Sequence, residues 1–260
     1  MRTKRYHTLA LVSVLLISFS ESFALPSKDL ARARAKWIKY VNKKPQKLEK
    51  LYLKQALMVL PEENIFGQLP ISQFVEEKQN FFVSMATTQS DKLYEHSERK
   101  VLDTGKIYRA DIVENVTDSL FYAIAWRKVG GDWLRELDII LPFTSEKVSA
   151  TYELDSLRTL WINYANSRDP DMMIKTLYYR DAVYLNGSEM SKGHAAMTKR
   201  FDFMRNPAFS INLEVQDICS VDEQMVVDIG HWITGEYVGY YLIVWKKELD
   251  DWKIFLYFNF

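Results

Sequence analysis

The chain repeats one sequence pattern twice, and this duplication constrains the fold more than any other feature. The segment AWRKVGGDW in the first half and the segment VWKKELDDW near the last residue carry two tryptophans at the same spacing. Other matches precede them in the same order. They pair Trp37, Tyr40, Asn42, Leu51, Tyr52, Ala56, Gly67, Gly105, Trp126 and Trp133 with Trp161, Tyr164, Asn166, Leu177, Tyr178, Ala182, Gly193, Gly230, Trp245 and Trp252, respectively. Such a repeat predicts two tandem domains of one fold.

Length and composition agree with two folded domains. The 260 residues are 48% hydrophobic and 14% aromatic, which is enough for two cores. Lys plus Arg and Asp plus Glu number 34 each, so the net charge gives no reason to expect a nucleic acid partner. The segment LPFTSEKVSATYELD passes from strand-like to helix-starting residues. We therefore expect the first domain over residues 25–146 and the second over residues 147–260.

The first 24 residues are typical of a secretory signal peptide. A basic start is followed by the apolar run Leu9–Phe19 and by small residues that end at Ala24. The alternative is an uncleaved anchor, but the run is shorter than the roughly 20 residues that span a bilayer. We expect cleavage after Ala24, a secreted or periplasmic protein, and no membrane association afterwards. The sequons at Asn115 and Asn186 matter only if the host glycosylates exported proteins.

Each copy is expected to begin with helices and to end in a sheet. Apolar residues recur at helical spacing around Trp37 and again around Trp161. In SRDPDMMIKTLYY, Asp169 can cap a second helix whose first position is Pro170. A short strand, DAVYL, a third helix, GHAAMTKRFDFM, and four strand-like runs follow. This order predicts an α+β fold in which helices pack on one face of a strongly curved antiparallel sheet.

This order of elements, with YRDAVYLNG, SKGHAAMTKRF, VWKKELDDW and AWRKVGGDW, resembles the nuclear transport factor two-like superfamily, and within it SnoaL-like and ketosteroid-isomerase-like domains. The resemblance covers nearly the whole mature chain, twice. It implies two tandem cone-shaped α+β domains. Many relatives pair through their sheets, so it also implies an intramolecular pseudo-dimer, which further homo-oligomerisation could extend. The motifs are diagnostic of fold and only weakly of function, because this superfamily includes enzymes, binders and assembly modules.

The resemblance argues against isomerase chemistry. It places Asn186 where isomerases of this fold carry a catalytic carboxylate, and an amide cannot accept the proton. The matching position of the first copy is Leu60. The strands FYAIAW and YVGYYLIVW, where such enzymes hold a protonated acid, contain neither Asp nor Glu. Both acidic groups of that mechanism are therefore missing.

An alternative interpretation is that the protein is an enzyme of lyase or hydrolase type. Dehydratase relatives use His and Asp, and the resemblance makes Asp181 the best carboxylate neighbour of His231. The positions that alternate with His231 are apolar, so we expect its side chain to point into the cone. The histidines lack the paired spacing of a metal site, and we expect no metal and no cofactor.

The abundant aromatic residues support a different function. They could line a mostly apolar pocket with a few polar groups, although for any single one of them a place in one of the two cores or in a sheet-to-sheet interface is favoured. Our leading interpretation is an exported protein that binds a small apolar or amphipathic molecule in the cone of the second domain, the first domain being mainly structural. A protein-assembly module is a third alternative. The residues expected to bind ligand are Tyr164, Asn186, His231, Trp232 and Tyr241.

Overall fold

The computed structural model describes residues 28–61, 63–78, 81–82, 88–110, 117–143, 151–187 and 189–260. The expected signal peptide, the sequon at Asn115 and the expected boundary near residue 146 lie outside these residues. The described residues contain two six-stranded sheets, each formed by one half of the chain and each accompanied by helices. The expectation of two tandem α+β domains is therefore confirmed. Neither sheet closes into a barrel.

The two domains follow the same order of elements. The first contains α1 (Lys28–Lys43), the 3-10 helix η1 (Pro45–Leu51), β1 (Tyr52–Val59), β2 (Asn64–Phe66), α2 (Gln68–Glu77), β3 (Thr88–Ser97), β4 (Lys100–Ala110), β5 (Thr117–Val129) and β6 (Asp132–Phe143). The second contains α4 (Thr151–Asn166), α5 (Pro170–Leu177), β7 (Tyr178–Asn186), β8 (Glu189–Lys192), α6 (His194–Arg200), the 3-10 helix η2 (Phe201–Arg205), β9 (Asn212–Ser220), β10 (Met225–Thr234), β11 (Tyr237–Glu248) and β12 (Asp251–Asn259).

Helix α5 begins where the sequence predicts. The side chain of Asp169 accepts a hydrogen bond from the backbone N–H of Met172, and Pro170 takes the first helical position. The carboxylate thus satisfies one of the free N–H groups of the first turn, while proline lacks an N–H that would need a partner.

Each sheet is mixed, which differs from the expected antiparallel sheet. The strand orders are β2-β1-β6-β5-β4-β3 and β8-β7-β12-β11-β10-β9. Strand β1 runs parallel to β6, and β7 runs parallel to β12, whereas the other pairs are antiparallel. A parallel pair requires a long crossover connection, and here the rest of each domain lies between the two parallel strands. The sequence pattern alone does not reveal this pairing.

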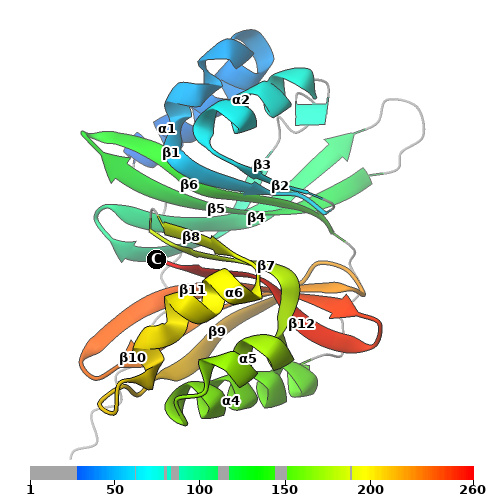
Figure 1. Ribbon diagram of the computed structural model, residues 1–260. Helices are drawn as coiled ribbons and strands as arrows, with labels where there is room; N and C mark the ends of the chain where they lie inside the picture. Colours follow the sequence, from blue (N-terminus) through cyan, green and yellow to red (C-terminus); the bar gives the residue numbers. More distant parts are fainter. Residues whose placement is uncertain are drawn as a thin grey trace, which may run out of the picture.

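The two sheets pack against each other and the helices lie outside (Figure 1). One apolar cluster contains residues of both sheets, including Leu57 and Leu137 of the first and Val227 and Leu256 of the second. Across this interface, Tyr94 Oη donates a hydrogen bond of 2.7 Å to the carboxylate of Asp217. Both faces of each sheet are therefore covered, one by helices and one by the other sheet.

The helices of each domain cover the face of its sheet that points away from the other sheet. The space between these helices and that face is the interior of the domain, which we call the cone. The cone of the first domain is the apolar cluster between its helices and its sheet, with Trp37, Tyr52 and Trp126 among its members. The cone of the second domain contains the matching Trp161, Tyr178 and Trp245. Among the described residues, no helix is both long and apolar enough to span a membrane.

Candidate functional site

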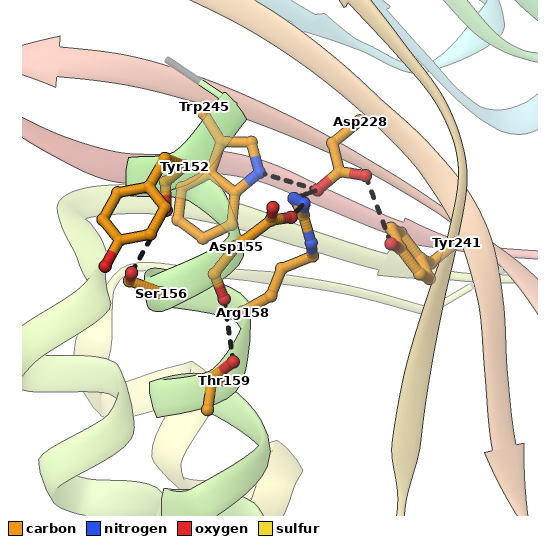
Figure 2. Close-up of polar contacts among 8 residues, drawn as sticks. All are labelled: Tyr152, Asp155, Ser156, Arg158, Thr159, Asp228, Tyr241 and Trp245. Carbon is orange, nitrogen blue, oxygen red and sulfur yellow. Dashed lines mark hydrogen bonds and ion pairs between the residues drawn. The ribbon is translucent and has the colours of Figure 1, made fainter.

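A buried aspartate lies at the centre of the second domain and accepts three side-chain hydrogen bonds (Figure 2). Arg158 of α4 and Trp245 of β11 donate to Asp228 Oδ2 over 2.9 and 3.1 Å, and Tyr241 donates to Oδ1 over 3.2 Å. Burial raises the pKa of the Asp228 carboxyl, and the positive charge of Arg158 opposes that rise. Because all three donors point inward at a fully buried group, the carboxylate of this aspartate is held in place and closed to solvent.

The first domain contains the same cluster at the matching positions. Arg34 of α1 lies 2.6 Å from the carboxylate of Asp103, and Tyr122 donates to that carboxylate over 3.3 Å. Trp126 occupies the position of Trp245, but its buried Nε1 has no hydrogen-bond partner among the described residues, so the contact of Trp245 with the aspartate is not repeated. We call these four-residue groups the Arg-Asp clusters. A cluster that appears in both domains is a part of the fold rather than the site of an activity peculiar to one of them.

Glycine is required beside the cluster of the second domain. A Cβ atom at Gly230 would lie 2.2 Å from the carbonyl oxygen of Glu214 and 2.6 Å from Tyr241 Oη. The tyrosine ring reaches Asp228 by crossing the strand at this glycine. In the first domain, Tyr122 is paired with Gly105 across the strands and likewise donates to the aspartate two residues before the glycine.

Each cone also contains a hydrogen bond between a tryptophan and a tyrosine, and the two domains differ in what the tyrosine hydroxyl contacts next. Trp161 Nε1 donates to Tyr178 Oη over 2.8 Å, and Trp37 Nε1 donates to Tyr52 Oη over 3.0 Å. In the first domain, Tyr52 Oη then donates to the buried carboxylate of Asp138 over 2.8 Å.

Arg135 completes this group of charges. Its guanidinium donates to Asp138 and lies 4.0 Å from the centre of the Trp37 ring, where it makes a cation–π contact. The matching residues of the second domain are Ile254 and Tyr257. The cone of the first domain thus holds an additional buried ion pair where the second domain has apolar and aromatic side chains.

The first domain also has a cavity of about 510 Å³. It lies between α2, the residues just after it, and the ends of β1, β5 and β6, on the side of the sheet that faces the cone. We call this end of each domain the mouth of its cone. The residues that line the cavity are Leu60, Pro61, Glu63, Phe74, Lys78, Phe81, Leu120, Ile140 and Pro142.

The mouth of the second domain is polar. Strand pairing places Asn186 and Asn259 side by side where the first domain has Leu60 and Ile140. Both amide groups donate to Tyr184 Oη, over 3.1 and 3.2 Å. This tyrosine replaces Met58, so the hydrogen-bonded group occurs in the second domain alone.

Trp232 fills part of the same mouth. A Cβ atom at Gly239 would lie 2.3 Å from Trp232 Cζ2, so the indole ring rests directly on this glycine. The residue of the first domain that matches Gly239 is Leu120, which lines the cavity. Trp232 is half-buried and packs against the apolar cluster of the cone.

His231 does not point into the cone, contrary to the prediction. Its ring lies 4.3 Å from that of Tyr240, which also contacts His96 of the first domain. The side chain therefore faces the interface between the sheets. The alternating residues Val227 and Ile229 belong to the cluster shared by both sheets. The alternating pattern correctly indicates that His231 lies on an apolar face. Both faces of this sheet are apolar, however, so the pattern does not show which of them carries His231.

Asp181 and His231 are not brought together. Strands β12 and β11 lie between β7, which carries Asp181, and β10, which carries His231. Three strand spacings of about 4.8 Å separate the two backbones by roughly 14 Å. Asp181 is exposed, and no hydrogen bond or ion pair joins the two residues within the described part of the chain. The proposed dyad has no structural support.

The five residues expected to bind a ligand do not converge on one site. Tyr241 is fully buried against Asp228, and His231 and Trp232 point to opposite faces of the sheet. Asn186 is exposed at the mouth, and Tyr164 is half-buried on α4. Among the described residues, no group of three or more His, Cys, Asp or Glu side chains is arranged to hold a metal ion.

The comparisons with known proteins identify likenesses of fold. No protein-family model matches the sequence, and no curated protein matches it. Solved structures that are similar to part of the chain include an NTF-2 like protein of unknown function from Shewanella oneidensis MR-1. The match has 10% sequence identity and a TM-score of 0.38, and it covers 45% of this chain and 99% of that one.

Two further structures are similar over about half of the chain. An NTF2-like protein of unknown function from Pseudomonas putida KT2440 has 15% identity and a TM-score of 0.36, with 43% of this chain and 85% of that one covered. A domain of unknown function with a cystatin-like fold from Nostoc punctiforme PCC 73102 has 12% identity and a TM-score of 0.39, with 52% and 88% covered. All three likenesses concern the fold alone.

Proposed function

We propose that this protein binds a small, mainly apolar molecule in the cavity at the mouth of the first domain. The observation that carries the proposal is the cavity itself. Its volume of about 510 Å³ lies within the ~300–1,000 Å³ that is usual for small-molecule sites. Its described lining residues are apolar except for Glu63 and Lys78. These two side chains suit a ligand that carries one polar end.

The proposal moves the ligand from the second domain, where the sequence suggested it, to the first. In the second domain, aromatic rings occupy the cone: Tyr184 lies 4.7 Å from Phe201 and 5.4 Å from Tyr257, measured between ring centres. Trp232 and the hydrogen-bonded asparagines fill the mouth. An apolar ligand would have to displace these groups, whereas the first domain offers open space.

The proposed setting is outside the cytoplasm, since the first 24 residues have the pattern of a signal peptide. A binding role also agrees with the separation of Asp181 from His231, which leaves the enzymatic alternative without its acid–base pair. Among the described residues that line the cavity, Glu63 is the one carboxylate. A single carboxylate beside one lysine suits recognition of a polar end better than acid–base chemistry.

The test is a titration of residues 25–260 with the neutral fluorescent probe N-phenyl-1-naphthylamine. We expect saturable binding of one probe per chain. Leu120→Trp adds a large ring to the cavity and should weaken binding at least tenfold, about 1.4 kcal/mol. Phe74→Arg, which introduces the arginine found at the matching position Arg200, should act in the same direction.

The matched control is Val129→Trp, on the same strand as Leu120 but at an exposed position outside the cavity. This variant should bind the probe like the unchanged protein. Circular dichroism and thermal unfolding establish that each variant is folded. If the probe does not saturate, or if folded Leu120→Trp and Phe74→Arg bind it with unchanged affinity, the proposed site is wrong.

A further inference from the structure

A second cavity in the first domain lies between the first turns of α1 and the hairpin that joins β5 to β6. Its volume is about 360 Å³, and it shares no residue with the cavity at the mouth. One part of its lining is apolar and another is charged. The residues are Asp29, Arg32, Ala33, Lys36, Leu51, Gly131, Asp132, Trp133 and Leu134.

Trp133 contributes a hydrogen-bond donor that is not used. Its side chain is more than nine-tenths buried, with the residue 7% exposed. Its Nε1 atom is buried and has no hydrogen-bond partner among the described residues. A buried N–H without an acceptor is unfavourable and is uncommon in folded proteins. This donor therefore calls for an acceptor that the described residues do not provide.

The second domain shows which kind of acceptor fits. Trp252, the counterpart of Trp133, donates from Nε1 to the carboxylate of Glu153 over 3.0 Å. Glu153 lies in the first turn of α4, five residues before Arg158. The tryptophan N–H thus points to the start of the helix, and a carboxylate receives it there.

In the described part of the first domain, no carboxylate accepts the hydrogen bond of the matching indole. The residue that lies five positions before Arg34 is Asp29, whose side chain is one methylene shorter than that of Glu153. Asp29 forms ion pairs with Arg32 and, at 3.8 Å, with Lys128. Its carboxylate is therefore held by cations and makes no hydrogen bond with Trp133 Nε1. The lining of the cavity includes Asp29 and Trp133, the residues that match Glu153 and Trp252.

We propose that this cavity binds the carboxylate of a small molecule that also carries a short apolar chain. The carboxylate accepts the hydrogen bond from Trp133 Nε1 and thereby replaces the group that Glu153 supplies in the second domain. Around the cavity, the cations Arg32, Lys36 and Lys128 outnumber the carboxylates Asp29 and Asp132, so the ligand's negative charge is balanced. The apolar chain contacts the remaining lining, which consists of Ala33, Leu51, Leu134 and the Trp133 ring.

The test observes the two indole N–H groups separately by nuclear magnetic resonance. In residues 25–260 labelled with 15N, the signals of Trp133 and Trp252 are assigned from Trp133→Phe and Trp252→Phe. Sodium hexanoate is then added, with 1-hexanol as the uncharged probe of the same chain length. Hexanoate should move the Trp133 signal downfield in a saturable way, and hexanol should not. Neither compound should move the Trp252 signal.

Two reciprocal substitutions sharpen the result. Asp29→Glu restores the missing methylene, so the Trp133 signal should shift downfield without ligand and lose its response to hexanoate. Glu153→Asp removes the acceptor from the second domain, so the Trp252 signal should become responsive. Leu120→Trp, which fills the other cavity, should leave the hexanoate response of Trp133 unchanged. The proposal is overturned if hexanoate leaves the Trp133 signal in place, if hexanol moves it equally, or if neither reciprocal variant changes the response of its own tryptophan.

Discussion

At the mouth of the first domain, Leu60 and Ile140 border an apolar cavity, whereas the matching Asn186 and Asn259 of the second domain form hydrogen bonds to Tyr184. Deeper in the cones, the Arg-Asp clusters occupy matching positions in both domains. The two copies therefore agree at the arginine and aspartate that fix a helix to the sheet, and they differ at the mouth, where a ligand could enter. This contrast separates residues that maintain the fold from residues that could give each domain its own function.

The Arg-Asp cluster of the second domain should produce the largest effect when it is broken. Arg158→Met leaves the carboxylate of Asp228 buried without its cation. Removing one partner of a buried ion pair typically costs about 3–5 kcal/mol, because the remaining charge is uncompensated. We expect a loss of that size in the free energy of unfolding by urea. The matching Arg34→Met should cost less, since the side chain of Arg34 is 18% exposed and that of Arg158 is 5% exposed.

Arg205→Met is the control for this prediction. Arg205 pairs with Asp171 and Asp202 on the surface, and exposed pairs contribute at most about 1 kcal/mol. A loss for Arg158→Met no larger than that of Arg205→Met would show that the cluster does not maintain the fold. The loss in Arg158→Met should also shrink as the pH falls, because a buried, unpaired carboxyl has a raised pKa and becomes neutral on protonation.

The additional ion pair of the first domain can be exchanged for the side chains of the second. Arg135→Ile alone leaves Asp138 buried without its cation and should cost about 3–5 kcal/mol. Combining it with Asp138→Tyr reproduces the pair Ile254 and Tyr257, and we expect most of the loss to be recovered. A double-mutant cycle measured by urea unfolding gives the coupling between the two positions.

The outcome of this exchange distinguishes two explanations for the difference between the cones. Recovery in the double variant means that either pair suits the common scaffold. If the two single substitutions instead cause losses that simply add in the double variant, Arg135 and Asp138 are not coupled. Arg135 would then be stabilised mainly by Trp37 and its other neighbours.

The sequence predicted the repeat and the order of elements because these depend on local patterns. The helix cap at Asp169 and the matching positions of the paired tryptophans could be predicted for the same reason. The face to which His231 points could not be inferred, since both faces of its strand are apolar and alternation cannot distinguish a helix-covered face from a sheet-covered one. The parallel pairing of β7 with β12 is equally non-local.

The Arg-Asp clusters could have been predicted from the sequence, because their charged residues recur at matching positions of the repeat. Arg34 precedes Trp37 by three residues, as Arg158 precedes Trp161, and an aspartate precedes each of the paired glycines by two. Charged residues repeated within apolar surroundings indicate a buried pair. The cavities had no such signal, because they depend on side chains that are missing from one copy and on contacts between distant segments.

Replacement of the paired glycines tests whether the two clusters are built alike. Gly230→Ala places a Cβ atom 2.2 Å from a backbone oxygen that cannot turn away, and it displaces Tyr241 from Asp228. We expect a loss of about 3 kcal/mol in urea unfolding, at the upper end for overpacking. Gly105→Ala should act in the same direction. Gly235→Ala, where no atom lies within 4 Å, should cost about 1 kcal/mol, since only its positive φ is unfavourable.

The smallest expected effect concerns the interface where the domains meet. Burial lowers the pKa of His96, and the charges of Lys100 and His231 lower it further. The folded protein therefore binds fewer protons than the unfolded chain at pH values just below the ordinary histidine pKa of about 6.5, so stability should fall as the pH decreases through that range. Solvent screens this partly exposed group, so the contribution should stay below about 1 kcal/mol.

His96→Gln isolates this contribution. Glutamine keeps a polar side chain near Tyr240 and Phe260 but cannot take up a proton. The melting temperature of the unchanged protein should decrease more than that of His96→Gln between pH 7.5 and pH 5.5. Equal decreases would mean that the other groups alone account for acid sensitivity. A larger decrease in the variant would mean that protonated His96 finds a favourable partner, and the interface would then be an acid-stabilised contact rather than an acid-sensitive one.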